Sequence, residues 1–210
     1  AEELQEKHIH VVNMLGCHDG IPLLDLKGLI SEGKIQQLID TVVSRGGMVK
    51  NLHGQKNVYY QVNSTYYSAL GEDDKKMLMA RALQLFMPGK PQVWYLDLFA
   101  GKNDYEAVKR AGAGGHKEIN RSNLSREQVE EALNSDIVKS QIDMLKFRNT
   151  FEAFDFDAKL EMTEDNNVVT FIWKHKGCTA VLKADLKEMT FEMSGEDKNG
   201  EIVYRFGTRE

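Results

Sequence analysis

Cysteine, proline and long apolar runs are scarce in this chain. Its 210 residues include two cysteines and three prolines. Cys17 and Cys178 lie far apart and match no metal-ligand spacing, so the composition excludes a disulfide scaffold and favours a reducing compartment, the cytoplasm. No apolar run approaches the roughly 20 residues that a membrane-spanning helix needs. We therefore expect no membrane among its partners.

Basic charge is also in short supply. The chain has 27 lysines and arginines against 32 aspartates and glutamates, a formal net charge of -5, and the basic residues are scattered. A nucleic-acid-binding protein needs a dense basic surface to displace the counterions of the phosphate backbone. The composition therefore excludes nucleic acid as a partner, although a few cations could still hold one small anion. With 41% hydrophobic residues, the rest of the composition is that of an ordinary globular protein.

Apolar runs and helical periodicities alternate along the first 150 residues. This order of strands and helices indicates part of a parallel α/β structure, whose strands are buried on both faces. The sequence predicts buried strands at 8–15 and 92–96, a short strand at 58–62 and a loop at 48–55. It also predicts helices that begin after the N-cap Ser31, cover 63–70, run from Asp74 to Phe86, and cover 105–111. Another helix begins at a capping box formed by Ser125 and Gln128, and a longer one ends near Phe151.

The pattern changes from about Phe154 to the end of the chain. Short apolar or alternating segments at 168–173, 179–184, 190–193 and 202–204 are separated by polar turns such as 164–167 and 198–200. Such segments are typical of paired strands joined by tight turns. We expect a small antiparallel β domain of roughly five strands, distinct from the α/β part.

His18 and Asp19 are the strongest candidates for chemistry. They follow the first predicted strand directly, and α/β folds build their sites at the carboxyl ends of such strands. A carboxylate there can accept hydrogen bonds from two neighbouring sugar hydroxyls, and its charge favours an oxocarbenium-like transition state. The imidazole beside it can bind the same hydroxyls. The alternative is an ordinary turn, because Asp-Gly is a common turn pair.

Two weaker patterns involve basic residues and histidines. Lys117 and Arg121 lie close to the glycines at 112–115, and together they suggest an anion pocket, although the spacing is not that of a P-loop. His8 and His10 face the same side of the predicted first strand. A metal site there would need a third ligand, and no spacing offers one, so we expect core or edge histidines and no metal.

A set of motifs across nearly the whole chain resembles one enzyme family. In chain order they are MLGCHDGIP at 14–22, YQVNSTYYSALG at 60–71, PGKPQV at 88–93, AGKND at 100–104, INR at 119–121 and FRN at 147–149. Together they resemble sucrose phosphorylase and its close relatives, which are glucoside phosphorylases of the α-amylase clan (glycoside hydrolase family 13).

The resemblance implies that this chain is the C-terminal portion of a (β/α)8-barrel enzyme. Residues 1–19 would hold barrel strand seven and its catalytic loop, and residues 20–71 would be an inserted subdomain on the acceptor side. Barrel strand eight and its flanking helices would occupy 72–153, and 154–210 would form the C-terminal antiparallel β domain. We therefore expect the α/β part to be the end of a barrel with strands seven and eight.

The resemblance also implies a retaining double displacement with inorganic phosphate as co-substrate and no cofactor. The Asp nucleophile and the Glu acid/base of the family would lie on earlier strands, so the 210-residue chain alone is expected to be inactive. Asp19, with His18 beside it, corresponds to the carboxylate that stabilises the transition state. Tyr60 and Gln61 correspond to residues lining the acceptor and phosphate site, and Lys117 stands where an arginine helps to bind the donor sugar.

Several departures from the family pattern leave the substrate open. Gly16 stands where many relatives have Asp, Ser122 where a His is common, and Lys117 keeps the charge of an arginine without its bidentate fork. Sucrose phosphorylase, which converts sucrose and phosphate to glucose 1-phosphate and fructose, is the favoured activity. The enzymatic alternatives are phosphorolysis of sucrose 6-phosphate, glucosylglycerate or glucosylglycerol, and hydrolysis or transglucosylation. The alternative of another class is a non-catalytic remnant that serves carbohydrate binding or subunit contact. The expected partners are a small sugar, phosphate and a second copy of the chain in a homodimer.

Overall fold

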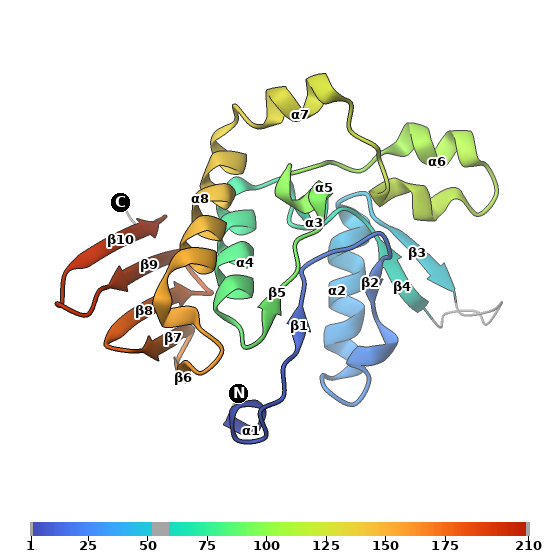
Figure 1. Cartoon of the computed structure of the whole chain (residues 1–210). Coiled ribbons are helices and arrows are strands. Elements are labelled where there is room, and N and C mark those ends of the chain that lie inside the picture. The colour runs from blue at the N-terminus through green and yellow to red at the C-terminus, as the bar shows by residue number, and fades with distance from the viewer. Residues whose placement is uncertain (1, 52–58, 209–210) are drawn as a thin grey trace. The chain divides into compact units, whose positions relative to one another are not determined.

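The computed structural model describes residues 2–51 and 59–208, with the backbone only at positions 50, 51, 59 and 60 (Figure 1). Contacts divide the chain into two compact units, which are described separately. The first unit comprises Ala1–Met14, Asp74–Gln92 and Lys139–Glu210, and the second comprises Leu15–Asp73 and Val93–Val138. The division into contiguous domains at 1–19, 20–71, 72–153 and 154–210 remains a prediction.

A five-stranded antiparallel sheet dominates the first unit. Its strands follow one another in space in the order β10-β9-β8-β7-β6, so each strand pairs with its neighbour in sequence. This confirms the antiparallel module predicted from the polar turns. The strands are β6 (Lys159–Asp165), β7 (Val168–His175), β8 (Cys178–Asp185), β9 (Thr190–Glu196) and β10 (Ile202–Gly207).

Two helices pack against this sheet. Figure 1 shows α4 (Asp74–Phe86) and α8 (Asp136–Thr150) running beside each other next to the strands. Alternate residues of β8 are buried, as expected for a strand with one covered face. The shared core includes Phe86, Phe147 and Trp173, and the indole N–H of Trp173 donates to the Phe86 carbonyl at 2.9 Å. The short η3 helix (Glu152–Phe154) also contributes to this core.

The first unit also contains a short parallel strand pair. β1 (Val12–Asn13) pairs with β5 (Lys90–Pro91), and the helix α1 (Glu2–Glu6) precedes β1. The predicted strand over 8–15 is therefore wrong in its length, and its predicted burial is also wrong, since Val12 is 59% exposed. The physical reason is that β1 pairs with one neighbour among the described residues, which leaves part of the strand uncovered.

The predicted strand over 92–96 is wrong in type. The structure has β5 two residues earlier and a helical turn, α5 (Tyr95–Leu98), in the second unit. Leu96 and Asp97 are buried by this turn. A short apolar run fits a buried strand and a buried helical turn equally well, because periodicity does not separate them.

The second unit contains a three-stranded antiparallel sheet with the order β2-β4-β3. Its strands are β2 (Ile21–Pro22), β3 (Met48–Asn51) and β4 (Tyr59–Asn63), so β4 confirms the predicted short strand. The predicted loop over 48–55 is wrong where β3 forms. A strand of four residues is too short to show a clear alternation of polar and apolar side chains, and its pairing with a neighbouring strand decides that it forms.

The helix α2 (Glu32–Ser44) shares a small core with this sheet. Ser31 accepts a hydrogen bond from the backbone N–H of Lys34, which confirms it as the N-cap. Ile35, Ile39 and Val42 are buried in a cluster with Val62 of β4. The remaining elements of this unit are η1 (Leu24–Leu26), α3 (Tyr66–Ala69), α6 (Tyr105–Ala111), η2 (Gly115–Asn120) and α7 (Arg126–Ala132), which starts at the predicted capping box.

Over the described ranges, 2–51 and 59–208, no helix has both the length and the apolar character required to cross a membrane.

Candidate functional site

The loop formed by residues 16–20, here called the Asp19 loop, follows β1 in the chain and belongs to the second unit. The backbone packs closely at both ends. Gly16 N–H donates to Asp97 Oδ2 at 2.9 Å, and Asp97 is 2% exposed. A Cβ on Gly20 would lie 2.7 Å from the Val62 carbonyl oxygen of β4. Larger residues at these two positions would push the loop away from its supports.

At position 16 this chain has a glycine, where the resemblance implies an aspartate in many relatives. A Cβ on Gly16 would lie 2.8 Å from Asp97 Oδ2. The buried carboxylate of Asp97 thus occupies the space beside Gly16 where the resemblance places an aspartate in many relatives. An aspartate at position 16 of this chain would meet both the atoms and the charge of Asp97.

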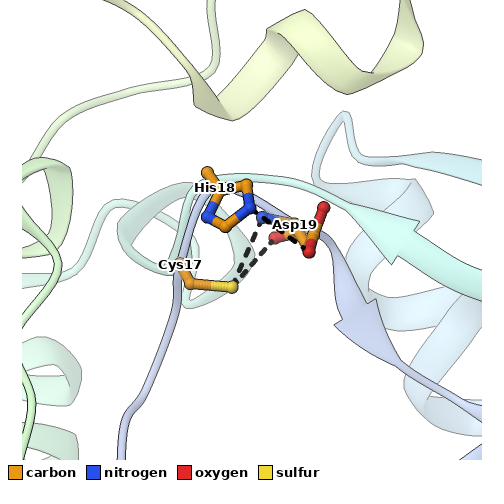
Figure 2. A group of neighbouring side chains, drawn as sticks. All are labelled: Cys17, His18 and Asp19. Carbon is orange, nitrogen blue, oxygen red and sulfur yellow. Dashed lines mark hydrogen bonds and ion pairs between the residues drawn. The ribbon is translucent and has the colours of Figure 1, made fainter.

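His18 and Asp19 carry their side chains out toward solvent, with 61% and 57% of each side chain exposed. His18 Nε2 lies 3.5 Å from Asp19 Oδ2. Figure 2 shows the two side chains next to each other. The His18 ring also lies 6.0 Å, between centroids, from the indole of Trp94. The structure therefore brings the two predicted catalytic residues together, at an accessible position.

A guanidinium completes the surroundings of Asp19. Arg121 Nη2 lies 3.4 Å from Asp19 Oδ1, and Arg121 Nη1 lies 3.6 Å from a carboxylate oxygen of Glu118. The Arg121 side chain is 30% exposed, so its charge is partly shielded from water. The guanidinium and the neighbouring imidazole contact separate oxygens of the Asp19 carboxylate. The arrangement can present an oriented negative charge to a hydroxyl-bearing or cationic group.

Cys17 is a neighbour that the sequence interpretation had set aside. Its sulfur accepts a hydrogen bond from the Asp19 N–H at 3.3 Å, and the ligand atoms of Cys17, His18 and Asp19 all lie within 4.8 Å of one another (Figure 2). Thiolate, imidazole and carboxylate are the ligand types that zinc accepts. The guanidinium of Arg121 beside Asp19 opposes a cation at this place, so these three residues do not by themselves make a metal centre.

Gln61 and Tyr60 lie on β4, which pairs with β2 directly after the Asp19 loop. The register aligns Pro22 with Gln61 and Ile21 with Val62. Gln61 is 5% exposed, and its Nε2 donates to Asn63 Oδ1 at 3.2 Å. The side chain of Tyr60 lies outside the described part of the structure. A ligand role for either residue remains a prediction.

Lys117 lies on η2, three residues before Asn120. It is partly exposed, and its ammonium makes no hydrogen bond or ion pair with the described residues. The neighbouring glycines have a conformational role, because Gly112 (φ 68°) ends α6 and Gly114 (φ 85°) precedes η2 in backbone conformations that favour glycine. These glycines are thus explained by the turn that they form, without a bound anion.

Ser122, which stands where the resemblance implies a histidine in many relatives, supports the segment after η2. Its hydroxyl donates to Asp104 Oδ2 at 2.9 Å, and its carbonyl accepts from the Tyr95 hydroxyl. Asp104 is the N-cap of α6, and the hydrogen bond from the Ala107 backbone N–H, with a further one from Ser122, holds the pKa of Asp104 below its ordinary value. Burial raises the pKa of Tyr95. These contacts give Ser122 a structural function in this chain.

Two curated relatives share most of this chain. A sucrose 6(F)-phosphate phosphorylase of Ilumatobacter coccineus is 49% identical over 212 residues, covering 96% of this chain and 40% of the relative. A sucrose phosphorylase of Streptococcus mutans is 34% identical, covering 88% of this chain and 39% of the relative. No family model matches the chain.

A solved structure agrees with the sequence relationship. The crystal structure of sucrose 6F-phosphate phosphorylase from Thermoanaerobacter thermosaccharolyticum matches with a TM-score of 0.87 at 36% identity, covering 96% of this chain and 42% of that chain. This chain belongs to the sucrose phosphorylases and related glucoside phosphorylases. It corresponds to a C-terminal portion and spans about 40% of the length of these phosphorylase relatives, which confirms the resemblance drawn from the motifs.

The sequence interpretation missed Asn120 as a support of the Asp19 loop of this phosphorylase chain, and it named Arg121 only for an anion pocket. Asn120 is 2% exposed and donates to two carbonyls of the loop, and Arg121 pairs with Asp19. Both residues lie in the INR motif, which carried the resemblance but suggested no role for Asn120. Their distance of about 100 positions from Asp19 hides the contact from any local pattern.

Proposed function

We propose that this chain is part of a glucoside phosphorylase of the α-amylase clan, with sucrose as the favoured glucosyl donor. In the first step a carboxylate nucleophile displaces fructose to form a glucosyl-enzyme. In the second step phosphate takes the glucosyl group, which yields glucose 1-phosphate and regenerates the carboxylate. The observation that carries the proposal is the Asp19 carboxylate, which Arg121 and His18 contact on separate oxygens while more than half of the side chain stays exposed.

Asp19 would stabilise the transition state in both steps. Its carboxylate would accept hydrogen bonds from two neighbouring glucose hydroxyls, and its negative charge would favour the positive charge that develops on the sugar ring. His18, 3.5 Å from the carboxylate, would bind the same hydroxyls. Arg121 supports this role because its Nη2 lies 3.4 Å from Asp19 Oδ1 and leaves Oδ2 on the side of His18.

The proposed architecture is the end of a (β/α)8 barrel. The parallel pair β1 and β5 would be its seventh and eighth strands, and residues 20–71 would shape the acceptor side. The nucleophile and the acid/base would come from earlier strands, so catalysis would require a polypeptide that includes them. The 210-residue chain alone would then show no turnover. What supports this architecture is the family relationship together with the parallel direction of β1 and β5.

Three further residues are assigned to substrate within this proposal. Lys117 would bind the donor sugar, and within the described part of the chain its ammonium has no hydrogen bond or ion pair that would compete with a ligand. Tyr60 and Gln61 would lie on the acceptor and phosphate side. The pairing of β4 with β2 supports this placement, because it holds Gln61 beside the strand that follows the Asp19 loop.

Sucrose 6-phosphate is a second candidate substrate. The relative named as a sucrose 6(F)-phosphate phosphorylase is 49% identical to this chain, whereas the relative named as a sucrose phosphorylase is 34% identical. Phosphorolysis of both sugars forms the same glucose 1-phosphate. A comparison of kcat/KM for the two donors decides between them.

The test is phosphorolysis by the polypeptide that the complete gene encodes. Sucrose, sucrose 6-phosphate, glucosylglycerate and glucosylglycerol are each incubated with and without phosphate, and glucose 1-phosphate and free glucose are measured. Phosphate-dependent glucose 1-phosphate is the expected product. Glucose released at the same rate without phosphate would replace the proposal with a hydrolase or transglucosidase, and no product from any donor would leave a carbohydrate-binding remnant.

Asp19→Asn tests the residue that carries the proposal. Its carboxamide keeps the size of the carboxylate and loses the charge, so kcat should fall by about 10³-fold. Asp25→Asn is the matched control, because Asp25 is an exposed carboxylate on η1 of the same unit. Activity of Asp19→Asn equal to that of the control would refute the assignment.

The remaining parts of the proposal concern cofactors, cellular location and oligomeric state. The reaction would need no cofactor besides its phosphate co-substrate. The two free cysteines suit a cytoplasmic location, and a homodimer is the proposed assembly. Sedimentation of the complete gene product with and without reductant tests the assembly.

A further inference from the structure

Three consecutive backbone carbonyls of the Asp19 loop accept hydrogen bonds from two consecutive side chains. Asn120 Nδ2 donates to the Cys17 carbonyl and to the Asp19 carbonyl, both at 2.9 Å. Arg121 Nε donates to the intervening His18 carbonyl at 2.8 Å. Residues 120 and 121 therefore hold the loop along its whole catalytic stretch, from a segment about 100 residues later in the chain.

Asn120 is buried, and its contacts fix the orientation of its side-chain amide group. The residue is 2% exposed, and its Nδ2 donates to two loop carbonyls. Its Oδ1 is buried without a hydrogen-bond partner among the described residues, a state that costs free energy. Turning the amide over would place Oδ1 against two carbonyl oxygens and lose both bonds. The observed orientation of Asn120 therefore keeps the two hydrogen bonds of Nδ2 and leaves Oδ1 without one.

Arg121 joins the backbone of the loop to its reactive side chain. One edge of the guanidinium donates to the His18 carbonyl, and Nη2 lies 3.4 Å from Asp19 Oδ1. A planar fork can make both contacts from one rigid group, whereas the ammonium of a lysine is a single point. The carboxylate is thereby set relative to the backbone that carries it, with Oδ2 left facing His18.

We infer that Asn120 and Arg121 are positioning residues that set the orientation of the Asp19 carboxylate, and that they act through the loop and not through substrate contact. The inference rests on the proposed function, in which Asp19 stabilises a transition state. Groups that stabilise a transition state lose most of their effect when they are displaced by a fraction of an ångström to an ångström. Loss of either positioning residue should therefore reduce kcat more than it changes KM.

The test uses Asn120→Ala and Arg121→Lys in the polypeptide that the complete gene encodes. Asn123→Ala is the matched control for the first variant, because it makes the same chemical change on an exposed residue two positions after Arg121. We expect kcat on the preferred donor to fall by about 10- to 100-fold in both variants, with KM within threefold of the wild type. The control should retain wild-type values.

A second measurement follows the loop without reference to activity. Amide hydrogen exchange in a peptide covering residues 16–20 should be at least about tenfold faster in Asn120→Ala than in Asn123→Ala, because two hydrogen bonds to the loop are gone. If Asn120→Ala does not fold, the kcat and KM of Arg121→Lys, a change at a partly exposed side chain, test the positioning role.

The outcomes separate the two proposals. A wild-type polypeptide with no phosphorolysis of any donor overturns the proposed function, and the exchange rates alone then decide whether residues 120 and 121 hold the loop. An active wild type whose variants keep kcat within twofold, or raise KM with unchanged kcat, overturns the positioning role and leaves the proposed function standing. Equal exchange in Asn120→Ala and Asn123→Ala would overturn it as well.

Discussion

Gly20 offers the sharpest test of how the Asp19 loop is supported. It is buried directly after Asp19 and before β2, where Ile21 pairs with Val62 of β4. A Cβ added at Gly20 would lie 2.7 Å from the Val62 carbonyl oxygen and 3.0 Å from Asn63 Nδ2, whereas ordinary contact begins at 3.4 Å. Gly20→Ala must therefore separate the loop from β4 by about half an ångström.

The cost follows from the atoms that obstruct the new methyl group. The nearest of them is a strand carbonyl, which cannot turn aside as a flexible side chain would. Overpacking of this kind costs about 1 to 3 kcal/mol in unfolding free energy. We expect Gly20→Ala to lose about 2 kcal/mol, and to lower kcat on the preferred donor about tenfold because Asp19 moves with the loop.

Gly33→Ala is the matched control for the same chemical change. Gly33 lies exposed on α2, and a Cβ there meets no atom within 4 Å. Alanine is a better helix former, so this variant should gain about 0.5 to 1 kcal/mol. Urea unfolding of the complete gene product, followed by circular dichroism, measures both changes. If Gly20→Ala is as stable as the wild type within about 0.5 kcal/mol, the close packing of the loop on β4 is refuted.

Two further predictions concern other parts of the chain. Arg148 donates to three backbone carbonyls of the first unit, at 2.8 to 3.3 Å, so Arg148→Met should lower the free energy of urea unfolding by about 3 kcal/mol. The control Arg126→Met changes an 86% exposed side chain and should alter this free energy by less than about 0.5 kcal/mol. Equal effects of the two variants would contradict the prediction. The backbone N–H of Ala107 lowers the pKa of Asp104 below 3.8, so the stabilisation by this carboxylate is complete above that value and is lost as the pH falls through the lower folded-state pKa. Asp104→Asn keeps an acceptor at the start of α6 but does not titrate. The unfolding free energy of this variant should therefore fall less steeply than that of the wild type as the pH is lowered. Parallel curves of unfolding free energy against pH for the two proteins would rule this out.

The sequence alone determined the family, the antiparallel sheet and the helix caps at Ser31 and Ser125, whereas the helix expected over 63–70 is the shorter α3, after the strand β4. Ser31 and Ser125 were identified as helix caps because capping is a local interaction between a side chain and the next turn. The strands of the C-terminal sheet were recognisable because tight turns separate them and each pairs with its sequence neighbour. His18 and Asp19 were identified by their place after a strand and by the motif around them.

Tertiary structure decided what local pattern could not. Tyr95–Leu98 is a helical turn and not a strand, because burial of Leu96 and Asp97 suits either conformation and the surrounding packing selects one. The short strand β3 depends on its pairing with β4. The support of Asp19 was equally invisible, since Asn120 lies about 100 positions away and contributes through two backbone carbonyls that carry no sequence signature. Chemistry-bearing side chains leave a pattern in the sequence, but the hydrogen bonds that orient them depend on which distant segments the fold brings together.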